Sequence, residues 1–180
     1  IAVDSMGVGE NIGGPGSLLK IVPTSGPMEC NNHGDGQLNP PYGTAGGTPG
    51  IGGGNYKENK KTGHRIFYSA KSQLIVGEDE MWVCVSTGGG GRGDPLKRTP
   101  EDVLESVFDG MVSLKVAKDV HGVVINKAKM TIDQTKTKAL RAKIRKKRGP
   151  LPNTFPNHAG AGKWHKSQMK GSEEYLTDTA

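Results

Sequence analysis

The chain has 180 residues, of which 33% are hydrophobic and 28 are glycine, and its formal net charge is +6. This length and composition allow one domain, or a domain with an appendage, around a modest core, and two cysteines are too few for a disulfide scaffold. No apolar run approaches the roughly 20 residues that span a bilayer, and the first residues do not resemble a secretory signal. We therefore expect a cytoplasmic protein with free thiols and no membrane partner.

The glycines divide the chain into two halves, because 22 lie before Asp94 and 6 lie after it. Glycine disfavours helix, so the first half is expected to form strands and loops. The second half is rich in Lys, Ala, Leu and Val and is expected to be helical. The fold class is therefore α+β, with a glycine-rich β segment (1–95), a helical segment (96–149) and an extended tail (150–180), completed by packing on a larger partner chain.

Four short strands are predicted in the first half, separated by glycine-rich loops. The last of them alternates but is apolar on both faces, which is typical of a strand that is buried on both sides. Residues 1–16 and 27–54 are expected to be loops. The four predicted strands are residues 17–23, 64–69, 72–76 and 80–87.

Two short helices are predicted to follow. Thr99 can cap the first, Pro100 suits its first turn, and Gly110 would end it. Its inner face would consist of Val103, Val107 and Phe108. A second helix would begin at a Ser113 cap and continue through Val120.

The positive charge lies in one segment. Between Asn126 and Arg148 there are ten Lys or Arg residues and one acid, so this stretch carries +9 and the rest of the chain −3. We expect a long basic helix capped by Thr131 and ended by Gly149, lying on a larger acidic partner surface. A phosphate or nucleic-acid contact is the alternative, but basic and aromatic residues are not interleaved there, so no nucleic-acid partner is expected.

Residues 30–36, CNNHGDG, place Cys30, His33 and Asp35 close together. A structural zinc site needs four ligands, usually in two spaced pairs, and no second pair follows, so no metal site is predicted. We interpret the segment as a loop that borders an active site, with His33 and Asp35 as candidate catalytic residues. A structural turn is the alternative. Cys84 lies in the strand that is predicted to be buried, which favours an unreactive thiol.

The run Gly88–Gly91 is followed by Arg92 and could offer backbone N–H groups to an anion. Gly89, Gly90 and Arg92 are therefore candidate substrate-binding residues. The sequence matches neither a Walker A loop nor a dinucleotide fingerprint. The alternative is a tight passage of these glycines against another backbone.

The order of these features resembles the hydantoinase B family. Its C-terminal signature has a glycine run, then Gly-Asp-Pro-Leu, an Arg-x-Pro helix start, Val-x-x-Asp-Val, Gly-x-Val-Ser and Tyr-Gly-Val-Val. Here Phe108 stands one place off that pattern and His121 replaces the tyrosine. The stretch from Pro40 to Gly50 is similar to the family's Pro-Pro-Trp-Gly and Gly-Gly-x-Pro-Gly. The resemblance covers roughly residues 10–148 and corresponds to the final quarter or so of longer relatives.

The resemblance implies a subunit of an ATP-dependent multi-subunit enzyme that is inactive alone. Its partners would be a larger hydantoinase B-like chain and an actin-like ATPase resembling hydantoinase A. ATP and a divalent metal (Mn, Mg or Zn) are expected on those partners. The leading expectation is a ketone carboxylase, of the acetone or acetophenone type, that carboxylates a phosphorylated enol with bicarbonate. The alternatives are a hydantoinase or 5-oxoprolinase-type lactam hydrolase and a purely structural assembly subunit.

Overall fold

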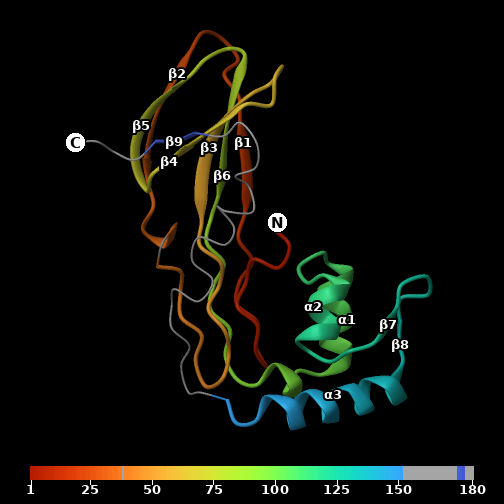
Figure 1. The fold of residues 1–180 in the computed structure, drawn as a ribbon. Helices are drawn as coiled ribbons and strands as arrows, with labels where there is room; N and C mark the ends of the chain where they lie inside the picture. Colours follow the sequence, from red (N-terminus) through yellow and green to blue (C-terminus); the bar gives the residue numbers. More distant parts are fainter. Residues whose placement is uncertain (38, 152–173, 177–180) are drawn as a thin grey trace.

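The computed structural model describes residues 1–37, 39–151 and 174–176, the last three by their backbone alone. It confirms a mixed α+β chain, with most strands to one side and the three α-helices to the other (Figure 1). The strands are β1 (Leu18–Ile21), β2 (Met28–His33), β3 (Gly54–Asn59), β4 (Arg65–Tyr68), β5 (Lys71–Val76), β6 (Glu80–Val85), β7 (Ile125–Asn126), β8 (Thr131–Ile132) and β9 (Glu174–Leu176). The helices are η1 (Asp35–Gln37), η2 (Pro95–Lys97), α1 (Pro100–Phe108), α2 (Leu114–Asp119) and α3 (Gln134–Arg148).

The main sheet has the strand order β1-β6-β3-β4-β9, and its pairs are antiparallel except for β4 with β9. A second, two-stranded antiparallel sheet is made by β2 and β5. Cys30, Leu74 and Val76 from this smaller sheet form a buried cluster with Tyr68, against which Trp82 of the main sheet packs. The two sheets therefore enclose a core between them.

Strand β6 lies inside the main sheet, between β1 and β3. Val83 and Val85 are buried on one face, at 0% and 3% exposure, whereas Trp82 and Cys84 on the other face are partly exposed. The prediction of a strand buried on both faces is therefore correct for one face and only partly correct for the other.

Residues 27–54 are not the continuous loop that was predicted, because β2 lies within them and β3 begins at their end. β2 turns Met28 and Cys30 inward and places Glu29 and Asn31 outside, and four of its six residues are polar. The strand is stabilised by its pairing with β5, which extends from Met28 opposite Val76 to His33 opposite Lys71. A polar strand of this kind carries a weak sequence signal because its paired residues are 38 to 48 positions away along the chain.

Three glycine-rich segments, residues 5–14, 43–50 and 88–92, run against one another next to the sheets, and we call them the glycine bundle. The N–H of Gly7 donates to the Gly89 oxygen at 2.8 Å, and the N–H of Gly91 donates to the Thr48 oxygen at 2.9 Å. A Cβ at Gly90 would lie 1.6 Å from the Tyr42 oxygen, closer than two atoms can approach. The predicted tight passage of the glycine run against another backbone is confirmed.

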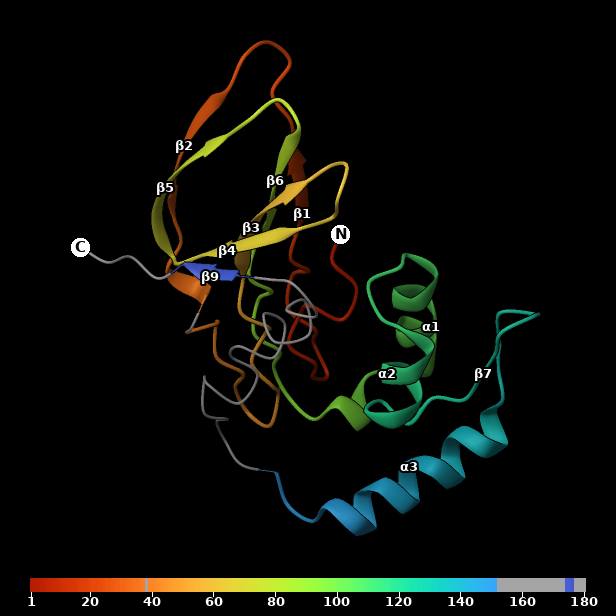
Figure 2. The same cartoon turned by 45° about the horizontal axis from the view of Figure 1, so that its top comes forward.

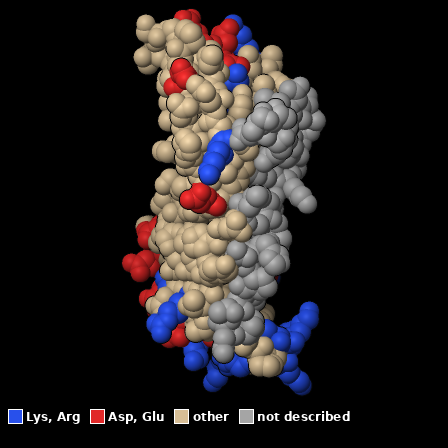
Figure 3. Space-filling view, turned by 90° about the vertical axis from the view of Figure 1, so that its left-hand side faces the viewer, with Lys and Arg blue, Asp and Glu red and all other residues tan. Residues whose placement is uncertain are grey.

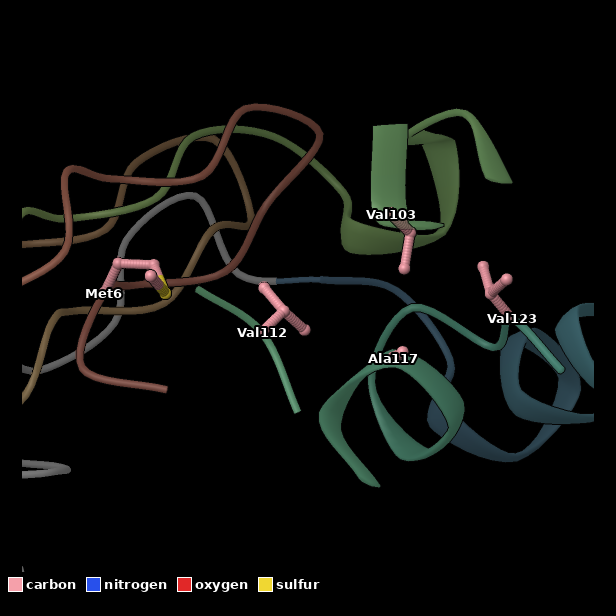
Figure 4. Close-up of a cluster of buried hydrophobic side chains, with 5 residues drawn as sticks. All are labelled: Met6, Val103, Val112, Ala117 and Val123. Atoms are coloured by element: carbon pink, nitrogen blue, oxygen red, sulfur yellow. The ribbon is translucent and has the colours of Figure 1, made fainter. Parts of the chain in front are cut away.

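Helices α1 and α2 pack on the N-terminal segment through one cluster of buried side chains. Figure 4 shows Met6 from that segment on one side and Val103, Val112, Ala117 and Val123 on the other. The predicted cap at Thr99 is confirmed, since its side chain accepts from the Asp102 N–H, and Ser113 caps α2 in the same way. The predicted inner position of Phe108 is wrong. Its side chain is 78% exposed, because the last turn of α1 directs it away from Val103.

Helix α3 begins at Gln134, with Asp133 rather than Thr131 as its N-cap. Thr131 lies instead in β8, opposite Asn126 of β7, so this short hairpin takes the position that was expected to start the helix. At the other end, the Arg148 guanidinium donates two hydrogen bonds of 2.8 Å to the Asp94 carboxylate. In Figure 3 the Lys and Arg side chains gather at the lower end of the molecule, where α3 runs in Figure 1.

Most of the predicted tail, 150–180, lies outside the described residues, although β9 pairs in parallel with β4. Within the described part of the chain, none of the helices combines the length and the apolar character needed to cross a membrane.

Candidate functional site

A hollow of about 260 Å³ opens where β2 and η1 pass the start of β3 and the end of β6. We call it the η1 hollow. Both candidate catalytic residues lie on its rim, His33 as the last residue of β2 and Asp35 as the first residue of η1. The residues that line it are Asn32, His33, Gly34, Asp35, Gly36, Gln37, Gly53, Gly54, Asn55, Cys84, Val85, Ser86 and Thr87.

Backbone hydrogen bonds hold the rim of the hollow in place. The Gly34 N–H donates to the Ala70 oxygen at 2.8 Å, and the Gly53 N–H donates to the Gly36 oxygen at 3.3 Å. The side chain of Gln37 is buried and donates to the Tyr68 oxygen at 3.3 Å. The side chains of His33 and Asp35, in contrast, are exposed to solvent. The rim is thus anchored by its backbone, and its two ionisable side chains are free to meet a ligand.

Asn55 and Asn32 also line the hollow, and neither was predicted from the sequence as a site residue. Asn55 is 1% exposed, and its side chain accepts from the Trp82 indole N–H at 3.2 Å and donates to the Ser69 oxygen. Asn32 donates to the Ser69 and Ala70 oxygens at 3.3 and 3.2 Å. Both amides therefore fix the β4–β5 connection. The feature of the sequence that could have pointed to Asn55 was its position directly after three glycines.

Cys30 does not join His33 and Asp35, because it turns inward to the core between the two sheets. Burial raises the pKa of the Cys30 thiol and of the Cys84 thiol, so both favour the protonated form. Both cysteines are free, as predicted. In the described residues, three or more His, Cys, Asp or Glu side chains do not meet in any group that could hold a metal ion.

Arg92 and its neighbouring glycines lie in the glycine bundle and do not line the η1 hollow. The Arg92 backbone exchanges two 2.9 Å hydrogen bonds with Asn11, and the Gly89 N–H donates to Gly14 at 2.8 Å. These N–H groups are engaged, because the close packing of the glycines brings carbonyl oxygens to them. The N–H groups of Gly89 and Arg92 are therefore not available to an anion, and substrate binding by Gly90 and by the Arg92 side chain stays a prediction.

A second hollow, of about 400 Å³, lies between α3 and the segment that leads into α1, with Lys138, Arg141 and Arg145 along it. Arg141 has a structural task, since it donates to the His121 oxygen at 3.0 Å and to the Arg98 oxygen at 2.7 Å. His121 itself is fully buried, with its Nδ1 3.1 Å from the Pro95 oxygen. Burial lowers the pKa of His121, and the charges of Arg98 and Arg141 act in the same direction. This histidine is therefore neutral and structural.

Sequence comparison connects this architecture with known proteins. The β subunit of caprolactamase from Pseudomonas jessenii is 33% identical over 147 residues, covering 79% of this chain and 25% of that subunit. The acetone carboxylase α subunit from Xanthobacter autotrophicus (strain ATCC BAA-1158 / Py2) is 32% identical over 108 residues, covering 58% of this chain and 13% of that subunit. This chain therefore spans a quarter or less of the curated relatives that it matches.

Solved structures share the fold. A nucleotide-free structure of acetone carboxylase matches 93% of this chain and 26% of its own, with a TM-score of 0.58 at 22% identity. A crystal structure of the ATP-dependent caprolactamase from Pseudomonas jessenii matches 78% of this chain and 24% of its own, with a TM-score of 0.57 at 26% identity. The model of the hydantoinase B/oxoprolinase family matches residues 1–95. Because that match includes 95 of the 180 residues, the chain belongs to the hydantoinase B/oxoprolinase family.

Proposed function

We propose that this chain forms part of a subunit of an ATP-dependent enzyme that hydrolyses a cyclic amide. The observation that carries the proposal is the match to the caprolactamase β subunit, which extends over 79% of the chain. A solved relative in the same fold is an ATP-dependent caprolactamase. The activity would belong to a larger assembly, because this chain corresponds to a quarter of such a subunit.

An amide carbonyl is a weak electrophile, which gives ATP a chemical role. Phosphorylation of the carbonyl oxygen, on a partner of the actin-like ATPase type, would make the carbon open to attack by water. The ring C–N bond would then break, with the nitrogen leaving as an amine and an acyl phosphate left behind, and a second water would hydrolyse this acyl phosphate to the carboxylate and inorganic phosphate. In this proposal ATP and any divalent metal are held by the partners, as the resemblance to the family implies.

The contribution of this chain would be one wall of the reaction site, formed by the η1 hollow. His33 and Asp35 stand exposed on its rim, and histidine and carboxylate are side chains that accept or donate protons during attack by water. The backbone hydrogen bonds of the rim would hold the two residues in position before the reaction, and groups that are already in position contribute most to stabilising a transition state. Arg92 lies away from this hollow, so its proposed role is contact with substrate or partner from the glycine bundle.

The second candidate is carboxylation of a ketone, in which an enol phosphate receives the new carboxyl group from bicarbonate. The match to the acetone carboxylase α subunit favours it, at 32% identity over 108 residues. The basic segment before Gly149 is the sequence feature that favours it. A purely structural assembly subunit is the non-enzymatic alternative, and in that case His33 and Asp35 would not affect turnover.

The test is phosphate release by the purified assembly that contains this chain. With ATP and caprolactam or another cyclic amide, release without bicarbonate is expected, together with the ring-opened amino acid. Release that requires bicarbonate and acetone or acetophenone would overturn the amide proposal and support the ketone carboxylase. No release under either condition would refute both.

The role of the rim is tested in the same assay with matched variants. His33→Gln and Asp35→Asn should each lower kcat by roughly 10²–10⁴-fold, the range for loss of an acid or base. The controls are His64→Gln and Asp79→Asn, which remove the same groups outside the hollow. Assembled complexes with unchanged turnover in all four variants would support the structural alternative.

A further inference from the structure

Strand β1 forms the outer edge of the main sheet, on the side away from β2 and β5 (Figure 1). It pairs with β6 and, among the described strands, with no other. Exposed apolar side chains nevertheless follow one another along it. Leu18 is 46% exposed, Leu19 52% and Val22, just beyond the strand, 46%.

These side chains lie on both faces of the sheet. Leu19 and Ile21 stand opposite Cys84 and Trp82 of β6, so they share the face that the β2–β5 sheet covers. Leu18 stands opposite Val85, so it lies on the other face. A strand that is apolar on both faces is typical of the interior of a covered sheet, not of its edge.

Exposed edges are commonly protected by charges, prolines or bulges that prevent another strand from pairing. In β1 the one charged residue is Lys20, and Pro23 follows after the strand has ended. Among the described residues, the backbone groups of β1 that point away from β6 pair with no other strand, and they lie beside an apolar surface. Such an edge is suited to accept a further strand through main-chain hydrogen bonds.

We infer that the β1 edge binds a β-strand from the polypeptide that supplies the rest of the family's length. The chain spans 25% of the caprolactamase β subunit and 13% of the acetone carboxylase α subunit, so such subunits contain a large part that these 180 residues do not include. This inference rests on the proposed function in one respect, namely that the chain works within such a subunit. The added strand carries apolar side chains toward both faces and an acidic residue opposite Lys20.

The test is amide hydrogen exchange of residues 18–22 in the purified assembly and in the isolated chain. The alternate amides of β1 that point away from β6 should exchange at least about tenfold more slowly in the assembly. Equal exchange in the two samples would overturn the inference. The turn at Gly77–Asp79, which lies outside the edge, serves as the internal reference.

A pair of variants tests the side chains. The double variant Leu18→Ser and Leu19→Ser should weaken assembly by about tenfold or more, because it removes apolar surface from both faces. Ile75→Ser is the matched control, since Ile75 is 63% exposed on β5, away from this edge, and should change assembly by less than about twofold. Unfolding of each isolated variant, followed by circular dichroism, verifies that the chain still folds.

Two further outcomes would overturn the inference. Equal assembly of the double variant and the parent would show that the edge is not the docking site. A dimer of the isolated chain that the double variant abolishes would show that the occupant is a second copy. Both measurements proceed without ATP or substrate, so they are independent of the proposed function. An assembly in which the β1 amides exchange slowly, but which turns over neither cyclic amide nor ketone, would refute the proposed function and leave this inference standing.

Discussion

The ion pair between Asp94 and Arg148 joins the end of α3 to the start of the helical half, and its removal should loosen that junction. The guanidinium donates one 2.8 Å hydrogen bond to each carboxylate oxygen, and the two side chains are 17% and 23% exposed. The Asp94 carboxylate also accepts from the Leu96 N–H at 2.8 Å, which caps η2. Asp94→Asn keeps an oxygen for that cap and removes the charge, so it isolates the ion pair.

The expected coupling follows from these contacts. Hydrogen bonds to charged groups contribute about 1.5–3 kcal/mol, and partial exposure to solvent reduces this, so we expect a coupling of about 1–2 kcal/mol. A double-mutant cycle of Asp94→Asn and Arg148→Met, followed by urea unfolding of the chain, measures it. In a chain of this size, that energy corresponds to a Tm decrease of about 2–8 °C. A coupling below about 0.3 kcal/mol would refute the assignment.

The same pair predicts a pH dependence. Burial alone would raise the pKa of Asp94, but hydrogen bonds from Arg148 and the Leu96 N–H, with the charges of Arg148 and Arg145, outweigh it and lower that pKa. A carboxyl with a lowered folded pKa stabilises the fold above its unfolded pKa of about 3.9, and this is lost as pH falls through the folded value. The coupling should therefore be equal at neutral pH and at pH 5.5, and should decline below about pH 4. A decline already above pH 5 would contradict this account.

Further predictions concern the glycine bundle, the buried histidine and one exposed aromatic. Gly90→Ala should prevent folding or lower the Tm strongly, because its Cβ would meet a carbonyl oxygen at 1.6 Å, whereas Gly14→Ala, with nothing within 4 Å, should unfold like the parent. Because the pKa of His121 is lowered in the fold, its neutral side chain contributes stability above the unfolded histidine pKa of about 6.5, and this stability is lost as pH falls below that value. His121→Gln should therefore flatten the profile of stability against pH between pH 5 and 7, whereas His64→Gln should leave it unchanged. Phe108→Ser should change the unfolding free energy of the isolated chain by less than about 0.5 kcal/mol, since the side chain is 78% exposed, and a larger loss in urea unfolding would contradict its placement.

The structure confirms all four strands predicted from the sequence, as β1, β4, β5 and β6. β4, β5 and β6 are apolar runs bounded by turns, and a turn at Glu78–Asp79 joins the last two. β3 is different, because its sequence, GNYKEN, has one large apolar residue, Tyr56. It is held by pairing on both sides, with the neighbouring β4 and with the more distant β6, and by the ion pair of Lys57 with Glu80 at 3.0 Å. Sequence reasoning could not identify this strand, since its partners determine it.

The same limit applies to the candidate site. Residue type drew attention to His33 and Asp35, and the spacing kept them on one loop. The opposite wall includes Ser86 and Thr87, which directly follow β6 and lie about 50 residues further along the chain. A Cβ at Gly36 would lie 2.1 Å from the Thr87 side chain, so the two walls meet at a glycine. This approach depends on the register of the sheets, which the local sequence pattern does not specify.

The η1 hollow and the apolar edge share strand β6. Val85 lines the hollow and also pairs with Leu18 at the start of β1. The next residue, Ser86, lines the hollow as well, and its hydroxyl accepts from the Ser17 N–H at 2.8 Å. A strand that docks on β1 would therefore lie two strand positions from β6, or about 10 Å at the usual spacing of strands. Because β1 alone would separate the docked strand from β6, docking would bring the larger polypeptide close to one wall of the hollow.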